Sequence, residues 1–485
     1  MGIRGREYMG KMRQSAGHSA CAAALALLLI FTALLGCLTG CAGPASLLAE
    51  KDVSGTYVVG EDTLPYTDDE LYEMLFDIHN KVEVDIDISE EQLALMQQDH
   101  EEYDWNGKKS PIYRMADLSI TITSDTSTCT YVIKECGVRM KGNTSRCSFY
   151  DEEKGIYKLI NLKLDLQDRT FAGLEKLEMK WNKNDDSTYV REYYAYEMFR
   201  AYGVPAQHMN LASTDFGGVH EGVFYLYEAV DQVFLARYYS EDRCGGNLYK
   251  VGWCGDKNGN FRDTSSIGVE DEGQGIFYAY DLKTNKKDAD YSDLKAVINA
   301  VKNGKATEEE LEALLDKDTF LRYAAVSYYV GNPDDLRYNY NNSFLYFFAD
   351  TGRMIVIPYD TDRCFGITKD WNPDGCAMTG KNPTERDTEC ELFLTTVCAG
   401  GVWEEEYMDL IEEIADSDWM SYDHFKEYYD LAYEHYGDET QPDYTMENAE
   451  NHHFAFDLAR DAGTGSWEDN CGIETYLEDK LSQVR

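Results

Sequence analysis

Basic residues are scarce in this chain. Of its 485 residues only 45 are lysine or arginine, against 89 aspartates and glutamates, and the formal net charge is −44. A protein that binds nucleic acid neutralises phosphates with clustered lysine and arginine, so this balance excludes nucleic acid as a partner. An acidic surface favours basic partners and metal ions, and it also keeps a protein soluble whatever its partners are.

Closely spaced cysteine pairs are missing as well. The 13 cysteines include no C-x-x-C pair, which argues against a zinc–thiolate site. Ten of them remain when the three nearest the N-terminus are set aside. An even number permits up to five disulfides outside the cytoplasm, and spacing alone favours the pairs Cys244–Cys254 and Cys390–Cys398.

The N-terminus carries a targeting signal. Basic residues precede an apolar run, residues 22–35, that is too short to span a bilayer comfortably. Leu38-Thr39-Gly40-Cys41 then resembles the lipobox of bacterial lipoproteins, in which the cysteine receives the lipid. Cys37 is an alternative lipidation site, and an ordinary signal peptide or an anchor helix is the alternative to the lipobox.

We therefore predict a lipoprotein signal peptide over residues 1–40, with lipidation at Cys41. The protein is expected at the bacterial cell surface, attached to the membrane only through this lipid. Residues 41–70 are polar and rich in turn formers, and they are predicted to be a tether.

Strand patterns dominate residues 71–250. Residues 82–88 alternate apolar and charged side chains, as a half-buried strand does, and Ser89 begins a helix with a capping pattern. A second helix is expected to start at Asp186 or Ser187 and to end before Pro205. Further strands are predicted at residues 116–123, 128–133, 137–140, 157–166, 174–181, 208–213, 222–228 and 246–250.

The second half of the chain has a helical pattern. Residues 251–290 are rich in glycine, aspartate and asparagine and are predicted to be an insert or mobile loop. Residues 291–485 are predicted to be a mostly helical lobe that surrounds a β-hairpin within residues 331–366.

This hairpin collects oxygen-bearing side chains at one end. Its strands, residues 343–348 and 353–358, are joined by an Asp-Thr-Gly turn, and paired strands of similar length start and stop side by side. We therefore expect Asp334, Asn342 and Asp360 to meet. Two carboxylates and an amide are ligands that Mg²⁺ and Mn²⁺ prefer. Asp334 could instead be a turn residue, because Pro-Asp-Asp is typical of turns.

The order of elements resembles the bilobal layout of protein kinases. The fold class is predicted as α+β, with an N-terminal lobe of mostly antiparallel strands and one key helix, and a helical lobe that carries a catalytic hairpin. Asn339 follows Asp334 at the five-residue spacing between the kinase catalytic Asp and its metal-binding Asn, and a metal-binding Asp beyond the hairpin completes the set. No GxGxxG and no HRD motif is present, so the pattern of ordinary kinases is absent.

Six collinear segments resemble the spore-coat protein H (CotH) kinase family. Together they cover about residues 80–370. They are VRMKGNTS at 138–145, FAGLEKLEMKWNKNDDSTYVREYYAYEMFRAYGVPA at 171–206, GVFYLYEAVDQVFL at 222–235, GNLYK at 246–250, GNPDDLRYNYNNSFLY at 331–346 and MIVIPYDTDRCFG at 354–366.

The resemblance implies roles for individual residues of the hairpin region. Asp334 would be the catalytic Asp, with Asp335 as its rival one position away. Asp360 would be the metal-binding Asp, and Asp362 would be either a further ligand or a salt-bridge partner of an arginine. Asn342 would be the second metal ligand, and Asn339 is the alternative.

The resemblance also implies a nucleotide site in the strand-rich lobe. Lys163 would be the phosphate-binding lysine, with Lys158 as the alternative, and Glu192 would be its ion-pair partner on the helix. Glu228 would lie near the adenine. The segment Lys141-Gly142-Asn143-Thr144-Ser145 would cover the nucleotide in place of a glycine-rich loop.

The implied function is an extracytoplasmic protein kinase. It would transfer the γ-phosphate of ATP, with Mg²⁺ or Mn²⁺, to serine or threonine of secreted or surface proteins. From the charge of the chain we expect basic, Ser/Thr-rich substrates, and we expect a monomer. A non-catalytic pseudokinase or surface adaptor, and a nucleotidyl (AMP) transferase on the same fold, are the alternatives.

Overall fold

The computed structural model describes residues 53–103, 110–142, 150–151, 156–157, 160–254, 258–269, 278–367, 375–442, 453–462 and 471–485. All of them belong to one compact unit, Asp52–Arg485. The predicted signal peptide and Cys41 lie outside the described residues. None of the helices in the described ranges combines the length and the apolar character that a membrane crossing requires.

The larger sheet has eight strands in the order β1-β4-β3-β2-β9-β10-β8-β7, and β4 also pairs with β7, so the sheet closes on itself. Its pairs are antiparallel except for β1 with β4 and β2 with β9. The strands are β1 (Gly55–Val58), β2 (Lys81–Asp87), β3 (Arg114–Thr123), β4 (Thr128–Met140), β7 (Leu162–Asp165), β8 (Lys176–Trp181), β9 (Met209–Phe216) and β10 (Val219–Glu228). The short pair β5 (Tyr150–Asp151) and β6 (Ile156–Tyr157) stands apart from it.

Sequence alternation explains the inner face of this sheet. In β2 the side chains of Val82, Val84 and Ile86 are buried while the acidic residues between them are exposed, which is the two-residue period of a strand with one covered face. The helical part of the chain contacts this sheet through Tyr436. Its hydroxyl accepts a hydrogen bond from the backbone N–H of Val82 (2.8 Å) and donates to the carbonyl of Leu211 (2.9 Å).

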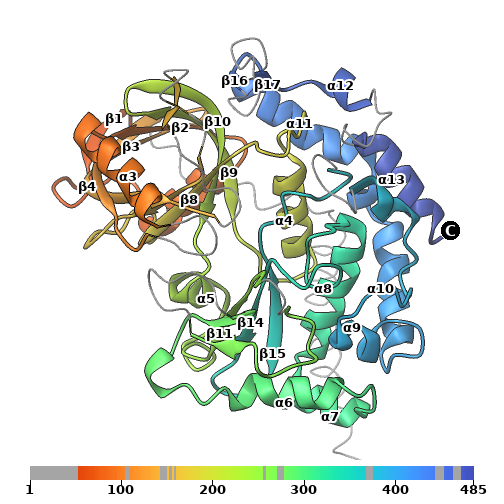
Figure 1. The fold of residues 1–485 in the computed structure, drawn as a ribbon. Helices are drawn as coiled ribbons and strands as arrows, with labels where there is room; N and C mark the ends of the chain where they lie inside the picture. The colour runs from red at the N-terminus through yellow and green to blue at the C-terminus, as the bar shows by residue number, and fades with distance from the viewer. Residues whose placement is uncertain are drawn as a thin grey trace, which may run out of the picture. The chain divides into compact units, whose positions relative to one another are not determined.

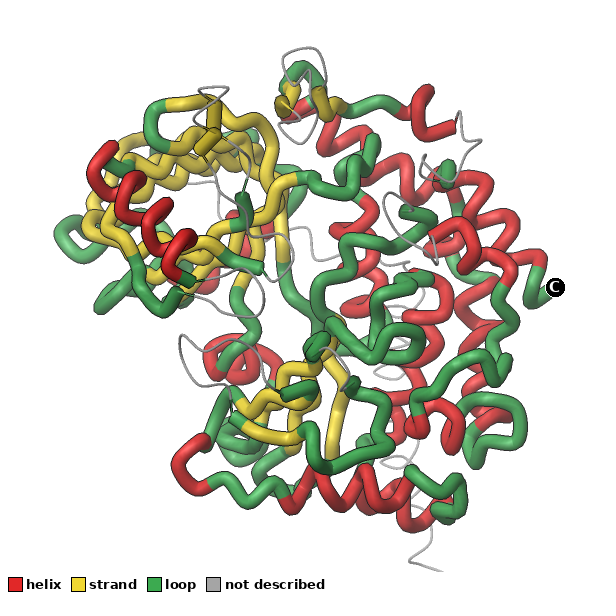
Figure 2. Tube along the Cα trace, in the orientation of Figure 1, coloured by secondary structure: helices red, strands yellow, loops and turns green. Residues whose placement is uncertain are grey.

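The smaller sheet contains the predicted hairpin. Its order is β12-β13-β11-β14-β15, and Figure 2 shows its strands as a second yellow group below the larger sheet. The strands are β11 (Leu248–Val251), β12 (Ile267–Gly268), β13 (Tyr280–Leu282), β14 (Ser343–Phe347) and β15 (Met354–Pro358). All residues of β14 and β15 are buried, as expected for short, continuously apolar strands.

Helices cover both faces of the hairpin. The helix α5 packs through Phe234 and Leu235 on a cluster that includes Phe344 and Ile357, and α8 lies against β15 on the helical side (Figure 1). The helices are α2 (Asp68–Phe76), α3 (Glu90–Glu102), α4 (Arg191–Ala201), α5 (Gln232–Tyr238), α6 (Ser292–Val301), α7 (Glu308–Leu314), α8 (Lys317–Val330), α9 (Glu391–Thr396), α10 (Glu404–Ala415), α11 (Tyr422–Tyr436), α12 (Leu458–Ala462) and α13 (Ile473–Ser482).

Gly331 ends α8 and starts the turn that carries Asp334. It has a left-handed backbone with φ of 60°, and its N–H donates to the carbonyl of Ser327. A Cβ at this position would lie 1.8 Å from the hydroxyl of Tyr476. Glycine is required here for both reasons, as at many helix C-termini.

The N-terminus of α4 differs from the prediction. The helix begins at Arg191 rather than after Asp186 or Ser187, and its N-cap Val190 makes no side-chain cap. The carboxylate of Asp186 instead accepts from the backbone N–H of Thr188 (2.9 Å) and of Arg191 (3.1 Å). Asp186 therefore accepts a hydrogen bond from the first turn of the helix although it lies in the preceding loop. The preference of aspartate for helix N-termini does not tell this position from a true N-cap.

Three predicted domain boundaries need correction. The strand β1 lies within the predicted tether, residues 41–70, and pairs with β4. The predicted insert, residues 251–290, contains β12 and β13, which extend the smaller sheet. The strand β11, assigned to the first lobe, pairs with β14 of the hairpin.

The two predicted disulfides are not formed. Cys390 and Cys398 are buried thiols, and Cys244 and Cys254 are not joined. The sulfur of Cys244 instead faces the carbonyl oxygen of Tyr239. Spacing in the sequence was the only basis for these pairs, and it does not determine how the two side chains are oriented.

Arg191 offers a test of the packing between α4 and the C-terminal region. Its guanidinium is buried and binds Asp461 (2.6 Å), Asp186 (3.4 Å) and the carbonyl of Cys471 (2.6 Å). Arg191→Ala leaves two buried carboxylates without their cation, so we expect the free energy of unfolding to fall by about 3–5 kcal/mol in chemical denaturation.

Arg262 is the matched control, because it also binds two carboxylates, Glu389 and Glu391, but at the surface. Arg262→Ala should cost less than about 1 kcal/mol. Equal losses for the two variants would contradict the role assigned to Arg191.

Candidate functional site

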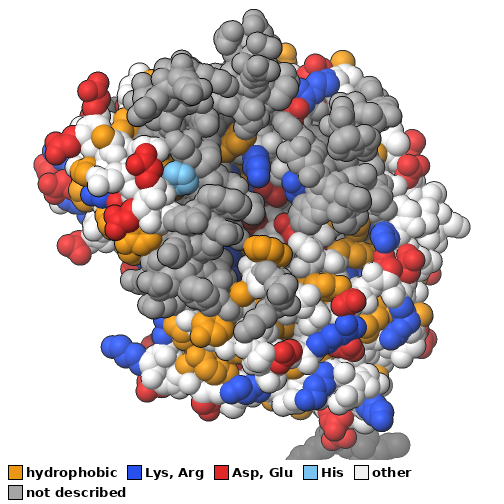
Figure 3. Space-filling view, in the orientation of Figure 1, with side chains coloured by type: hydrophobic (Ala, Val, Ile, Leu, Met, Phe, Trp, Pro, Cys, Tyr) orange, Lys and Arg blue, Asp and Glu red, His pale blue; other side chains and the backbone are white. Residues whose placement is uncertain are grey.

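The candidate site is a cavity of about 1020 Å³. Its walls come from the larger sheet, the start of α4, the smaller sheet and the turn after α8. The space-filling view shows basic and acidic side chains together in the recess beside the larger sheet (Figure 3). The cavity is lined by both polar and apolar residues, as ligand sites generally are.

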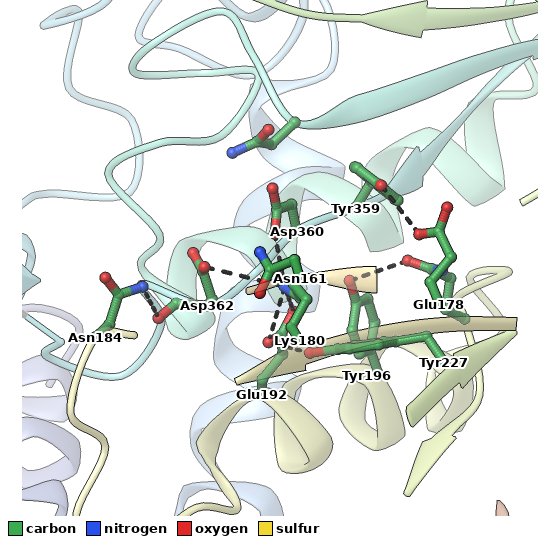
Figure 4. Close-up of polar contacts among 12 residues, drawn as sticks. Asn161, Glu178, Lys180, Asn184, Glu192, Tyr196, Tyr227, Tyr359, Asp360 and Asp362 are labelled. Carbon is green, nitrogen blue, oxygen red and sulfur yellow. Dashed lines mark hydrogen bonds and ion pairs between the residues drawn. The ribbon is translucent and has the colours of Figure 1, made fainter. Parts of the chain in front are cut away.

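Lys180 of β8 is the centre of this site. Its ammonium donates to Asp360 at 2.6 Å and to both oxygens of Glu192 at 3.1 and 3.3 Å (Figure 4). Asp362 lies 4.0 Å away, and the ring of Tyr227 lies 4.8 Å below the ammonium. Burial alone lowers the pKa of Lys180, but Asp360 and Glu192 outweigh burial and raise this pKa well above its usual value.

Glu192 lies in the first turn of α4 and is itself held from two sides. Besides Lys180, the hydroxyl of Tyr227 donates to it at 2.6 Å. The predicted ion pair of Glu192 with Lys163 is wrong, because Lys180 of the neighbouring strand takes that place. Lys163 also lines the cavity but binds Glu178 at 3.3 Å.

The carboxylate of Asp334 is surrounded by amides. The side chains of Asn339, Asn341 and Asn342 donate to it at 2.6, 3.1 and 2.9 Å. This explains the three asparagines that follow the turn, since carboxylates that accept several hydrogen bonds are fixed in orientation. The predicted contact between Asp334 and Asn342 at the end of the hairpin is confirmed.

Asp335, the rival of Asp334, is a turn residue. Its carboxylate accepts from the backbone N–H groups of Arg337 (2.8 Å) and Tyr338 (2.9 Å), and it is buried. Asp334, and not Asp335, lines the cavity. The turn role that Pro-Asp-Asp suggested therefore belongs to the second of the two acids.

Asn342 and Asp360 flank the open end of the hairpin. Ser343 pairs with Pro358, and the N–H of Tyr359 donates to the carbonyl of Asn342 at 3.2 Å. Asn342 and Asp360 have left-handed backbones with φ of 45° and 56°. Such conformations in residues other than glycine cost energy and concentrate at functional sites.

The surroundings of Asp334 favour the neutral form of its carboxyl group. Burial raises the pKa of Asp334 to about 7; the amides of Asn339 and Asn341 oppose the shift, and the carboxylates of Asp362 and Asp360 add to it. The described residues contain no group of three or more His, Cys, Asp or Glu side chains arranged to hold a metal ion. The predicted metal ligands Asp360 and Asn342, with Asp362 as the further candidate, carry the oxygen donors that Mg²⁺ and Mn²⁺ prefer.

The remaining predicted residues have mixed outcomes. Lys141 and Gly142 line the cavity, whereas Asn143, Thr144, Ser145 and the alternative Lys158 lie outside the described residues. Glu228 does not line the cavity. It is fully buried and accepts hydrogen bonds from the backbone N–H (2.8 Å) and the ring (3.1 Å) of His208. The next residues of the chain, Ala229 and Val230, form the cavity wall instead.

The family of the chain follows from a comparison with family models. A model described as "CotH kinase protein" matches residues 138–476, which is more than half of the chain. The chain belongs to the CotH kinase protein family. The resemblance inferred from the six sequence segments is thereby confirmed.

A curated relative supports the same family. The inner spore coat protein H of Bacillus subtilis (strain 168) is 28% identical over 202 residues, which are 41% of this chain and 52% of that protein. The chain thus spans about half the length of this relative. The family match begins at Val138, so it leaves out β1, β2 and β3.

Sequence reasoning missed two residues of this CotH family member. Lys180 and Glu178 both lie in the predicted strand 174–181, and their even spacing places them on one face. That signal was present in KLEMKW, where apolar residues occupy the other face. Lys163 showed the same alternation in a shorter strand, and only the pairing of strands separates the two lysines.

The two lysines can be compared through stability. Lys180→Met leaves Glu192 and Asp360 without their shared cation, so we expect a loss of about 3–5 kcal/mol in the free energy of unfolding. Lys163→Met should cost about 1 kcal/mol or less, because Glu178 keeps Lys141 at 2.8 Å. Urea denaturation measures both values, and a larger loss for Lys163→Met would contradict the central place of Lys180.

Proposed function

We propose that this CotH family member is a protein kinase that transfers the γ-phosphate of ATP to serine or threonine with the aid of Mg²⁺ or Mn²⁺. One observation carries the proposal: the ammonium of Lys180 lies between Glu192 of α4 and Asp360 at the end of β15. In kinases a lysine on a strand is oriented by a glutamate on a helix, close to a metal-binding aspartate.

The arrangement of elements supports the same proposal. The closed sheet with α4 corresponds to the small lobe of a kinase, and the helices around β14 and β15 correspond to the large lobe. Under this interpretation the cavity between them is the nucleotide cleft. The ends of the two predicted lobes meet at Lys180 and Asp360, as a divergent bilobal kinase fold requires.

Each residue around the cavity has a proposed task. Asp360 and Asn342 would hold the metal, with Asp362 as a further ligand, and Lys180 would bind the α- and β-phosphates while Glu192 orients it. A divalent ion supplies positive charge to the phosphates when bound. Asp334 would align the substrate hydroxyl and accept its proton, with its own orientation fixed by Asn339 and Asn341.

The proposed setting is the outer face of a bacterial membrane. The lipobox at Cys41 supports a lipid anchor, and the relative from Bacillus subtilis is an inner spore coat protein. We propose secreted or surface proteins as substrates. The basic, Ser/Thr-rich character expected of them rests only on the net charge of −44.

The proposal predicts separate effects for two acids. Asp334→Asn should lower the incorporation of label from γ-labelled ATP into casein or myelin basic protein by at least about 100-fold, because the hydroxyl loses its proton acceptor. The same variant should still show a rise in melting temperature with ATP and Mn²⁺. Asp360→Asn should lose both the labelling and the Mn²⁺-dependent rise, because a ligand of the ion is gone.

Asp350→Asn is the matched control, since Asp350 is an exposed acid in the turn of the same hairpin. It should label substrate as the unchanged protein does. Labelling that persists in Asp334→Asn contradicts the assignment. A protein that shows neither labelling nor a melting shift with ATP and Mn²⁺ is a surface adaptor instead, and a substrate that gains an adenylyl mass in mass spectrometry identifies a nucleotidyl transferase.

A further inference from the structure

Two residues of β8 with opposite charge have opposite surroundings. Lys180 is a cation among carboxylates, as described above. Glu178, two residues earlier and on the same face of the strand, is an anion among cations: Lys141 lies 2.8 Å and Lys163 3.3 Å from its carboxylate. The electrostatic influence of Lys250 reaches Glu178 as well. The proposed kinase roles use Lys180 and leave the cluster around Glu178 without a function.

This second cluster is built by both sheets. Lys163 stands directly opposite Glu178 in the pairing of β7 with β8, and Lys141 follows the end of β4. Lys250 comes from β11 of the smaller sheet and lies 4.0 Å from the centre of the Tyr359 ring, whose hydroxyl donates to Glu178 at 3.2 Å. Figure 4 shows Tyr359 and Glu178 facing each other beside Asp360.

The carboxylate of Glu178 is almost inaccessible to solvent, with 8% of the side chain exposed. Burial works against its ionisation, but Lys141, Lys163 and Lys250 outweigh burial and hold the pKa of Glu178 below its usual range. The carboxylate of Glu178 thus binds Lys141 and Lys163 directly, and Lys250 acts on it from the smaller sheet. Lys141 and Lys250 also interact electrostatically with Asp360. Glu178 and the three lysines line the cavity, so a soluble anion can reach the same lysines.

The charge of the cavity wall points to an anionic ligand. Among the described residues that line it, eleven are lysine or arginine and eight are aspartate or glutamate. In the whole chain the imbalance has the opposite sign, with 45 lysines and arginines against 89 aspartates and glutamates. A concave site with a concentration of lysines in an otherwise acidic protein attracts and focuses anions, and lysine ammonium groups are common phosphate ligands.

We propose that Lys141, Lys163 and Lys250 form a polyphosphate-binding cluster in which Glu178 is a built-in counter-ion that a bound phosphate chain displaces. The inference rests on the proposed function in one respect, because the phosphate chain of ATP is then the natural ligand. Inorganic polyphosphate has the same chemistry and is the other source. A phosphate chain carries several negative charges, so it neutralises the lysines of this cluster more fully than the one charge of Glu178 does.

Inorganic tripolyphosphate tests this without catalysis. Its affinity for the whole protein is measured by titration calorimetry in EDTA. Glu178→Gln removes a competing anion, and we expect tripolyphosphate to bind about tenfold tighter. Lys250→Met removes one of the three cations of the cluster, and we expect tripolyphosphate to bind about tenfold more weakly.

Two exposed residues outside the cavity serve as controls. Glu175→Gln, just before β8, and Lys134→Met, in β4, should leave the affinity for tripolyphosphate unchanged. If Glu178→Gln lowers the stability, the rise in melting temperature caused by tripolyphosphate should still be larger than in the unchanged protein. Equal or weaker binding by Glu178→Gln overturns the role of Glu178, and unchanged binding by Lys250→Met overturns the cluster.

The outcome is separable from that of the proposed kinase activity. Tripolyphosphate binding with the predicted order of affinities, together with no labelling of any substrate, would support the cluster and contradict the kinase. Labelling that depends on Asp334, together with tripolyphosphate affinities that ignore Glu178 and Lys250, would do the reverse. A comparison of ATP with tripolyphosphate and adenosine then identifies the source, because a nucleotide site binds ATP more tightly than either part.

Discussion

One buried ammonium group connects the parts of this protein that form the candidate site. Lys180 comes from the larger sheet, Glu192 from α4 and Asp360 from the smaller sheet, and the distances between their charged atoms are those of direct hydrogen bonds. Separation of the smaller sheet would remove one of the two carboxylates that bind the buried ammonium of Lys180, and the loss of a buried ion pair costs several kcal/mol. The position of the hairpin relative to the larger sheet is therefore set by electrostatics as well as by apolar packing.

The hairpin was predictable because its determinants are local. Both strands are apolar runs joined by Asp350-Thr351-Gly352, and the predicted strands agree with β14 and β15 to within one residue at each end. Once the strands pair, Asn342 and Asp360 must lie at the same end. The contacts of the three asparagines with Asp334 are also local, because all three residues follow the same turn within eight positions.

The choice between Lys163 and Lys180 was not predictable from local pattern. Both lysines alternate with apolar residues in a strand, so the local pattern places each of them equally well on a polar face. The difference comes from strand order: β8 lies between β10 and β7, which brings Lys180 next to Tyr227 of β10 and over α4. Strand order depends on contacts between residues far apart in the sequence, and periodicity carries no information about it.

The same reason explains the misplaced boundaries. The strands β1, β12 and β13 have two to four residues each, too few to establish an alternating pattern against a polar background. They are strands because a neighbour offers an edge to pair with. Likewise Asp186 was recognised as a residue that satisfies a helix end, but its position in a loop outside α4 depends on Arg191 and on the C-terminal region.

The hydrogen bonds of Arg191 also give the C-terminal region a structural role. Asp461 and Cys471 bind this arginine, the N–H of Cys471 donates to Gly366 just beyond the hairpin, and Asp461 accepts from Ile473 at the start of α13. The described residues 458–462 and 471–473 thus connect the helix that carries Glu192 to the segment that carries Asp362. A chain that ends before α12 would lose these contacts. The C-terminal region therefore helps to hold the cavity wall in place, and its removal should destabilise α4.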